Sequence, residues 1–374
     1  MTPHKPKRIL LLYISQVSGH RHGAVAIQKS LKALDPDCEI RSLNGFGYTY
    51  PLMEKIVNTA YMGVIKRAPK IWEYLYDNPK VIKASEKIKE SIHKSSHKKF
   101  KPLFDEFKPD VVVCTQAFPC GMVADYKQVN NLSVKIIGVL TDFAPHLYWL
   151  HKGVDYYITP FEDAKKRYMN EGVKEGQIKV FGIPIRMKFA EKLDRDAVAG
   201  KLHLDVNIPT VLVMGGGQGL GPMKEAVKSL IGLNRPLQMI VIAGTNVKLL
   251  EWIKKNQKKT AKRIIVYDYA SNVDELMEVS SLIITKPGGM TTSECLVKGL
   301  PMVIVDPIPG QEERNSDFLV KSGIALRVDD KKKIGDSVQM LLNNPIKLQS
   351  MREAALKLAK PNAADDIARL VLNV

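Results

Sequence analysis

The stretch TKPGGMTTSE, residues 285–294, places two glycines between a short apolar run and a segment rich in hydroxyl side chains. If the apolar run is a buried strand and the following residues form a helix, free backbone N–H groups gather at the turn. Gly288 and Gly289 would let a ligand approach that backbone closely. Glu294, one turn further on, can accept hydrogen bonds from vicinal hydroxyls such as those of a ribose. An ordinary tight turn explains the same residues, and both interpretations stay open.

A second glycine-rich loop, MGGGQGLGP, covers residues 214–222. It does not fit the dinucleotide pattern GxGxxG, because Leu220 stands at the last position when the pattern begins at Gly215. It does not fit the P-loop pattern GxxxxGK[ST] either. Its backbone N–H groups are nevertheless expected at the same sheet edge as Gly288. Two such turns on one sheet predict a diphosphate ligand.

A third segment, PIPGQEERN (307–315), follows another apolar run. Here Gln311, Glu312 and Asn315 are expected in a loop, where amide and carboxylate groups can bind several sugar hydroxyls. A plain helix N-terminus with acidic residues in its first turn is the alternative.

The N-terminal half carries a candidate general base. In SGHRHGAVAI (18–27), His20 is expected at the end of the first strand, before a helix and facing the cleft between two domains. Histidine suits proton transfer near neutral pH. His22 is a weaker rival, because it falls further into the helix. A histidine in a surface loop without a catalytic role is the alternative.

The segment TDFAPHLYW (141–149) ends another expected strand of that half. Asp142, His146 and Trp149 are predicted to line an acceptor pocket, with Asp142 orienting a histidine.

Short β-branched strands alternate with helices along most of the chain, which is typical of parallel sheets covered on both faces. The expected strands are residues 8–14, 38–43, 111–116, 135–141, 155–159, 178–183, 210–215, 238–244, 264–269, 282–285, 302–306 and 325–328. The expected helices include residues 24–34, 222–233, 271–280, 290–299 and 363–373.

The polar run 186–209 precedes a fresh strand and is the expected linker. The chain is therefore predicted to form an N-terminal acceptor domain (1–188) and a C-terminal nucleotide domain (189–355), with a helix in 356–374 that packs back on the first. Both domains are expected to be doubly wound α/β sheets. Ligands bind such sheets at the carboxyl ends of the strands.

The chain has 374 residues, 45% of them apolar, and a formal net charge of +17. No apolar run is long enough for a transmembrane helix. The charge points to phosphate-bearing partners, namely nucleotides, nucleic acid or an anionic membrane. Neither a recognition fold nor a stacking platform for nucleic acid is visible. No dedicated metal-binding pattern is present, because DPD (35–37) and DRD (194–196) fall in a turn and the linker.

Between residues 51 and 101 no strand is expected. An apolar stripe (Leu52, Ile56, Ala60 and Val64), with Tyr61 and Ile65 beside it, is followed by Lys66, Arg67 and Trp72. This order is typical of a helix that lies in a lipid headgroup layer. A helical hairpin packed on the sheet explains the pattern equally well.

Together these motifs resemble those of the monogalactosyldiacylglycerol synthase and processive diacylglycerol glucosyltransferase family, whose members are inverting enzymes of the GT-B fold. The resemblance runs over most of the chain. It is strongest in TKPGGMTTSECLVKGLPMVIVDPIPGQEERN, which matches the family's donor-site pattern. SGHRHGAVAI is similar to its glycine–histidine motif, with Val17 and Ser18 where the family has glycines. TDFAPHLYW is similar to its acceptor-side motif.

The resemblance implies a role for each candidate residue. His20 would be the base, Glu294 would bind the ribose, and the uracil would lie near the backbone of Tyr269. The residues expected at the donor are Gly216, Gly217, Tyr269, Ala270, Lys286, Pro287, Gly288, Gly289, Met290, Thr291, Thr292, Glu294, Gln311, Glu312 and Asn315. The residues expected on the acceptor and membrane side are Asp142, His146, Trp149, Tyr61, Ile65, Lys66, Arg67 and Trp72.

The implied reaction moves glucose or galactose from a UDP-sugar to a hydroxyl of diacylglycerol in a single displacement that gives a β-glycoside. No cofactor or metal is expected, and domain closure would bring base and donor together. The implied location is cytoplasmic, on the inner face of the cell membrane. One alternative is a peptidoglycan-type N-acetylglucosaminyltransferase, which carries two glutamines where this chain has Gln311 and Glu312. A nucleic-acid-binding protein and a non-catalytic sensor of sugar nucleotides or lipids are the others.

Overall fold

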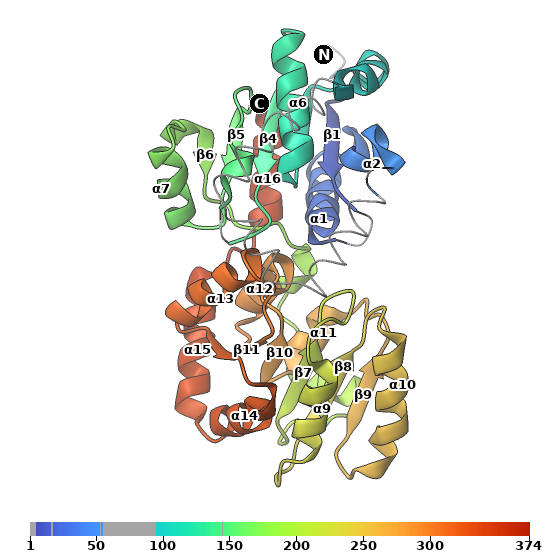
Figure 1. Ribbon diagram of the computed structural model, residues 1–374, viewed down its shortest axis with the longest axis vertical. Coiled ribbons are helices and arrows are strands. Elements are labelled where there is room, and N and C mark those ends of the chain that lie inside the picture. The colour runs from blue at the N-terminus through green and yellow to red at the C-terminus, as the bar shows by residue number, and fades with distance from the viewer. Residues whose placement is uncertain (1–4, 16–17, 53, 55–94, 144) are drawn as a thin grey trace. The chain divides into compact units, whose positions relative to one another are not determined.

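The computed structural model describes residues 5–15, 18–52, 54, 95–143 and 145–374 (Figure 1). The chain separates into two compact units, and each is described by itself. The first unit comprises Met1–Met187, Pro309–Gln311 and Asn362–Val374, and the second comprises Lys188–Ile308 and Glu312–Pro361.

The first unit is built on a parallel sheet of six strands in the order β2-β1-β3-β4-β5-β6. The strands are β1 (Arg8–Tyr13), β2 (Glu39–Asn44), β3 (Val111–Cys114), β4 (Lys135–Val139), β5 (Tyr156–Ile158) and β6 (Ile178–Lys179). The helices are α1 (Gly19–Leu34), α2 (Gly45–Thr49), residues 95–107, α6 (Ala117–Val129), α7 (Glu162–Asn170) and α16 (Ala363–Asn373). Short 3-10 turns lie at Leu147–Trp149, Glu175–Gln177 and Met187–Phe189.

Alternating side chains of the central strands fill two cores in this unit. In β1, Ile9 and Leu11 point into a cluster that includes residues of α1 and α16. Leu10 and Leu12 point into a second cluster on the other face, with residues of α6 and of the helix 95–107. Because successive residues of a strand face opposite ways, a strand that is apolar throughout must be covered on both sides.

Helix α1 begins where its sequence supplies a cap. The Ser18 side chain accepts a hydrogen bond from the backbone N–H of Arg21, as preferred N-cap residues do. Further on, Ile27 and Leu31 are buried four residues apart and pack in the same cluster as Ile367 of α16. The C-terminal helix therefore completes the core of the first unit (Figure 1).

The second unit also holds six parallel strands, in the order β12-β11-β10-β7-β8-β9. They are β7 (Thr210–Met214), β8 (Gln238–Ile242), β9 (Ile264–Tyr267), β10 (Leu282–Thr285), β11 (Met302–Val305) and β12 (Ala325–Val328). The helices are α8 (Arg195–Lys201), α9 (Met223–Ile231), α10 (Val247–Asn256), α11 (Val273–Val279), α12 (Gly289–Lys298), α13 (Gln311–Lys321), α14 (Ile334–Leu342) and α15 (Pro345–Leu358). Short 3-10 turns lie at Gln257–Lys259 and Lys331–Lys333.

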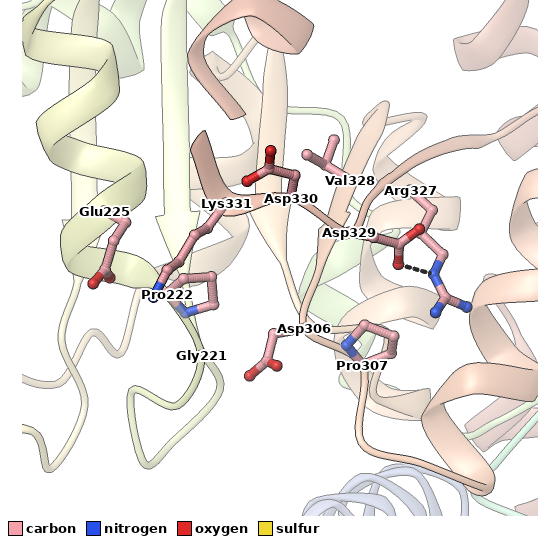
Figure 2. A pocket seen from close by; sticks show the side chains of 10 residues that line it. All are labelled: Gly221, Pro222, Glu225, Asp306, Pro307, Arg327, Val328, Asp329, Asp330 and Lys331. Atoms are coloured by element: carbon pink, nitrogen blue, oxygen red, sulfur yellow. Dashed lines mark hydrogen bonds and ion pairs between the residues drawn. The ribbon is translucent and has the colours of Figure 1, made fainter. Parts of the chain in front are cut away.

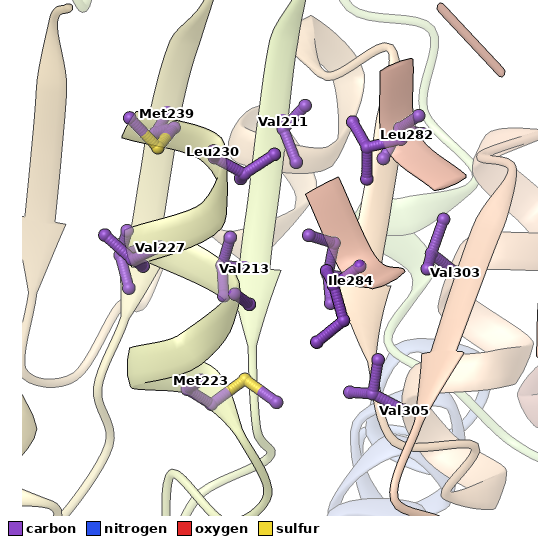
Figure 3. Packing of buried hydrophobic residues seen from close by; sticks show 14 of the residues in the cluster. Val211, Val213, Met223, Val227, Leu230, Met239, Leu282, Ile284, Val303 and Val305 are labelled. Atoms are coloured by element: carbon purple, nitrogen blue, oxygen red, sulfur yellow. The ribbon is translucent and has the colours of Figure 1, made fainter. Parts of the chain in front are cut away.

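Figure 3 shows how helix α9 covers one face of this sheet. Val227 and Leu230 of α9 pack with Val213 of β7 and Ile284 of β10 in a fully buried cluster. The intervening strand residues, such as Leu212, are also buried, so both faces of the sheet are covered. Burying each such aliphatic side chain contributes about 1.5–3 kcal/mol.

The predicted fold class, two doubly wound sheets, is confirmed, and all twelve expected strands are present within two or three residues at most ends. The expected start of one helix was wrong, because α1 begins at Gly19 rather than at residue 24. Helix α8 lies within the run 186–209, and residue 356 falls within α15. In the described part of the chain no helix has the length and apolar character needed to cross a bilayer. The predicted interfacial residues Tyr61, Ile65, Lys66, Arg67 and Trp72 lie outside the described residues.

Candidate active site

The strand order of the second unit creates a switch point between β7 and β10. From β7 the chain runs through β8 and β9 to one side, and then through β10, β11 and β12 to the other. At such a switch point the loops after neighbouring strands leave the sheet in opposite directions, and ligands bind there in doubly wound sheets. Those two loops are the glycine segments recognised in the sequence. Thr285 ties the two strand ends together, since its hydroxyl donates to the carbonyl oxygen of Met214 at 2.8 Å.

The loop after β7 is a compact turn that requires glycine. A Cβ at Gly219 would lie 2.0 Å from the carbonyl oxygen of Ala243, and the residue has a left-handed φ of 58°. The backbone N–H of Thr245 donates to the carbonyl oxygen of Gly217 at 3.0 Å, which braces the turn from outside. Gly216, with φ of 67°, has no heavy atom within 4 Å of a Cβ position. Its backbone is therefore open to a ligand.

Helix α12 starts without a side-chain cap in the described part of the chain. Its N-cap is Gly288, and its first intrahelical bond runs from the N–H of Thr292 to the carbonyl oxygen of Gly288 at 2.9 Å. The backbone N–H groups of Gly289, Met290 and Thr291 therefore precede the hydrogen-bond ladder, at the positive end of the helix dipole. Such an arrangement of N–H groups can bind an anion.

The hydroxyl residues of this helix do not cap it. The Ser293 hydroxyl donates to the carbonyl oxygen of Gly289 at 2.9 Å, inside the helix. The Thr292 hydroxyl is fully buried and, among the described residues, has no hydrogen-bond partner. The helix begins before these residues, at Gly289.

Residues of helix α13 add a charged contact and a hydrogen bond to the turn after β10. Lys286 Nζ lies 3.4 Å from Glu312 Oε2, which also accepts the N–H of Ile308 at 2.7 Å. Asn315 is fully buried, and its amide donates to the carbonyl oxygen of Pro287 at 2.9 Å. The expected loop position of Gln311, Glu312 and Asn315 was wrong: all three lie on α13. The alternative given from the sequence, a helix N-terminus with acidic residues in its first turn, is therefore confirmed.

The predicted contact of Glu294 with the ribose and the predicted position of the uracil near Tyr269 stay predictions. Glu294 is buried at 8% exposure in α12. Tyr269 is 66% exposed and Ala270 is buried just past β9, which is separated from β7 by one strand.

A cavity of about 640 Å³ opens at the carboxyl ends of β7, β11 and β12 (Figure 2). It borders the glycine loop at Gly221, where Lys286 Cδ lies 3.5 Å from a Cβ position. Four of its side chains are the acids Glu225, Asp306, Asp329 and Asp330, against the bases Arg327 and Lys331. Because like charges repel, the acidic lining disfavours a diphosphate in this cavity.

In the first unit His20 lies at the corresponding switch point, between β1 and β3. It belongs to the first turn of α1, not to a loop before it. Its Nδ1 lies 2.9 Å from the carbonyl oxygen of Thr115 and 2.8 Å from the hydroxyl oxygen of Thr141. These two threonines follow the neighbouring strands β3 and β4.

Burial changes the acidity of two groups at this edge of the sheet. It lowers the pKa of His20 to about 4, against a smaller opposing effect of the hydrogen bond to Thr115. It raises the pKa of Asp142 to about 6. Both shifts disfavour the charged form, as desolvation does. Perturbed groups in such positions are candidates for proton transfer.

The acceptor-side roles of Trp149 and His146 stay predictions, and the structure shows the surroundings of both side chains. Trp149 is only 6% exposed and lies in the hydrophobic core, with its Cε3 3.4 Å from a Cβ position at Gly138. The ring packs in this core, where a glycine on β4 makes room for it. His146 accepts the N–H of Tyr148 at 3.1 Å and stacks on its ring, so it shapes a turn.

The groups that hold His20 are ones that sequence reasoning missed. Asp142 was expected to orient a histidine, but the hydrogen bonds found on the His20 ring go to Thr115 and Thr141. Thr115 and Thr141 each stand just past an apolar strand. A hydroxyl residue at that position was the sequence signal that could have found them. In the described residues, no group of three or more His, Cys, Asp or Glu side chains is arranged to hold a metal ion.

Comparison with known proteins shows the family to which the chain belongs. A family model of monogalactosyldiacylglycerol (MGDG) synthase matches residues 20–185, and the C-terminal domain model of glycosyltransferase family 28 matches residues 210–367. A processive diacylglycerol β-glucosyltransferase of Bacillus cereus is 30% identical over 370 residues, which are 98% of this chain and 94% of that protein. The chain belongs to the monogalactosyldiacylglycerol synthase and processive diacylglycerol glucosyltransferase family. A Bacillus anthracis relative of the same description matches to the same extent.

Solved structures show the fold of this family member. MurG of Acinetobacter baumannii has a TM-score of 0.66 at 14% identity, over 99% of this chain and all of that one. S. aureus MnaA, solved with UDP, has a TM-score of 0.62 at 16% identity, over 96% of this chain and 94% of that one. The two-domain GT-B fold is therefore confirmed.

Proposed function

We propose that this family member transfers glucose from UDP-glucose to a hydroxyl of diacylglycerol and gives a β-glucoside. The observation that carries the proposal is the β7/β10 switch point. There an open glycine turn and an uncapped helix start present backbone N–H groups at one edge of one sheet. Such paired turns suit the two phosphates of a nucleotide diphosphate.

The choice of diacylglycerol and glucose rests on the relatives. The Bacillus cereus protein that matches over nearly the whole chain is a diacylglycerol β-glucosyltransferase. The monogalactosyldiacylglycerol synthase model matches only residues 20–185, outside the nucleotide-binding unit. Galactose is therefore the second choice. An N-acetylated sugar is disfavoured, because Glu312 stands where the peptidoglycan-type enzymes carry a glutamine.

The reaction is a single displacement. His20 takes the proton of the acceptor hydroxyl as its oxygen attacks the anomeric carbon of an α-linked UDP-hexose. The bond from that carbon to the β-phosphate oxygen breaks, and UDP leaves with the electron pair. The N-terminus of α12 and Lys286 stabilise the charge on the leaving diphosphate. We propose that these groups take the place of a metal ion.

Product analysis tests this function. The purified protein is incubated with UDP-glucose, UDP-galactose or UDP-N-acetylglucosamine and diacylglycerol in anionic or zwitterionic vesicles, with and without EDTA. We expect β-glucosyl-diacylglycerol, faster on anionic vesicles because of the net charge of +17, and no loss with EDTA. Transfer from UDP-galactose alone would change the donor assigned here. Transfer from UDP-N-acetylglucosamine alone would overturn both the donor and the acceptor.

The rate should depend little on pH in the neutral range. Only the neutral His20 ring accepts a proton, and burial lowers its pKa to about 4, so activity is lost only as pH falls through that value. We therefore expect kcat/KM to be flat from about pH 6 to 8 and to fall about tenfold per unit well below pH 4. A pH–rate profile with vesicle controls at each pH measures this. An inflection near 6 would instead assign the essential ionisation to Asp142, whose pKa burial raises to about 6.

A further inference from the structure

The His20 ring is fixed by its Nδ1 atom to the ends of two paired strands. Nδ1 lies 2.9 Å from the carbonyl oxygen of Thr115 and 2.8 Å from the hydroxyl oxygen of Thr141. The strands that precede these threonines are neighbours, with Cys114 opposite Gly138. The hydrogen-bond partners of the His20 ring thus lie at the ends of two strands. In the described residues none of the ring's hydrogen bonds goes to a carboxylate.

The chemistry of a carbonyl decides which ring nitrogen carries the proton. A carbonyl oxygen only accepts, so a neutral imidazole with Nδ1 at 2.9 Å must donate from Nδ1. In the other tautomer the Nδ1 lone pair would face the carbonyl lone pairs in a buried site. The Thr141 hydroxyl also lies 3.4 Å from the same carbonyl oxygen, and it can share the Nδ1 proton while donating to that oxygen.

Thr115 is attached to His20 at a second point. Its hydroxyl donates to the backbone carbonyl oxygen of His20 at 2.8 Å, and its N–H donates to that of Leu12 at 2.9 Å. Thr115 is fully buried. It therefore connects the end of β1, the first turn of α1 and the His20 ring in one rigid unit.

We propose that Thr115 and Thr141 are positioning residues of the reaction: Thr115 selects the tautomer of His20 that carries its proton on Nδ1, and Thr141 fixes the ring in place. Nε2 is then the atom that takes the proton of the acceptor hydroxyl. This inference rests on the assignment of His20 as the base. Because the partner of Nδ1 is a neutral carbonyl rather than the carboxylate of a Ser-His-Asp triad, the ring is oriented without a negative charge beside it to stabilise the imidazolium that forms.

The chain offers a matched control for Thr141. Thr159 also follows a strand of the same sheet, β5, and is fully buried. Its hydroxyl has no hydrogen-bond partner among the described residues. Thr159→Val and Thr141→Val remove the same group from equivalent positions, but only the second removes it from the His20 ring.

We expect Thr141→Val to lower kcat about 3–10-fold, with the KM for the UDP-hexose unchanged, because one orienting hydrogen bond is lost. Thr141→Ser should restore the rate, and Thr159→Val should leave it unchanged, with similar melting temperatures for both valine variants. In protein labelled with ¹⁵N-histidine, the His20 resonances without substrate should report a protonated Nδ1 and an unprotonated Nε2.

A His20 ring protonated mainly on Nε2 would overturn the role of Thr115, and equal kcat values for Thr141→Val and Thr159→Val would overturn that of Thr141. The tautomer measurement needs no turnover. If His20→Ala were as active as wild type, the proposed base would fail even with the Nδ1 tautomer observed. The two failures can therefore be told apart.

Discussion

His20→Ala should lower the rate of hexose transfer by about 10²–10⁴-fold, the usual contribution of a positioned general base. The ring is replaced by a methyl group, so the Nε2 atom that is proposed to take the proton is lost. Binding of UDP should persist, because the proposed phosphate site belongs to the second unit and His20 to the first. Initial rates on diacylglycerol vesicles and calorimetric titration with UDP measure the two effects.

The matched control is His22→Ala. His22 lies two residues further along the same helix and is exposed, so its removal tests the helix surface without removing the proposed base. We expect the rate of hexose transfer by His22→Ala to stay within about threefold of wild type, since substitutions at exposed positions usually have small effects. A His20→Ala rate that matches that of His22→Ala would rule out His20 as the base.

Gly288→Val should lower the affinity for UDP by at least about tenfold without unfolding the protein. Gly288 has φ of −68° and ψ of 143°, a conformation that any residue adopts, so valine brings no backbone strain. The nearest atom to a Cβ there is Glu312 Oε1, at 3.9 Å. The added side chain would instead fill the approach to the N–H groups of α12, and the lost interactions would exceed about 1.4 kcal/mol.

Gly200→Val is the control for this variant. Gly200 is an exposed residue of α8 in the same unit, with no atom within 4 Å of a Cβ position. We expect similar melting temperatures for both variants but normal UDP affinity only for Gly200→Val. Normal affinity in Gly288→Val would mean that the diphosphate does not approach this turn.

The sheets could be predicted from the sequence because their strands are apolar on both faces. Runs such as RILLLY in β1 leave no polar side to expose, so they indicate parallel strands covered by helices. The starts of helices were harder to predict from the sequence. The sequence of α1 shows its apolar spacing only from Ala24, whereas the structure starts the helix at the Ser18 cap, which satisfies an N–H group at once.

The candidate site was predictable where it is local in sequence. The glycine turns after β7 and β10 were found because glycine is required where backbone approaches backbone, as at Gly219. Contacts between distant segments were not predictable. The hydrogen bond between His20 and Thr115 joins residues 95 positions apart, and the one between His20 and Thr141 joins residues 121 positions apart. Periodicity and spacing carry no information about such pairs.

A crystal structure of the protein with bound UDP tests the central claim most directly. The account predicts diphosphate oxygens within hydrogen-bonding distance of the backbone N–H groups at Gly216 and Gly217 and of those at Gly289 to Thr291, with Lys286 beside them. A diphosphate bound at the acidic cavity around Asp306 and Asp329, or at the first sheet, would contradict it.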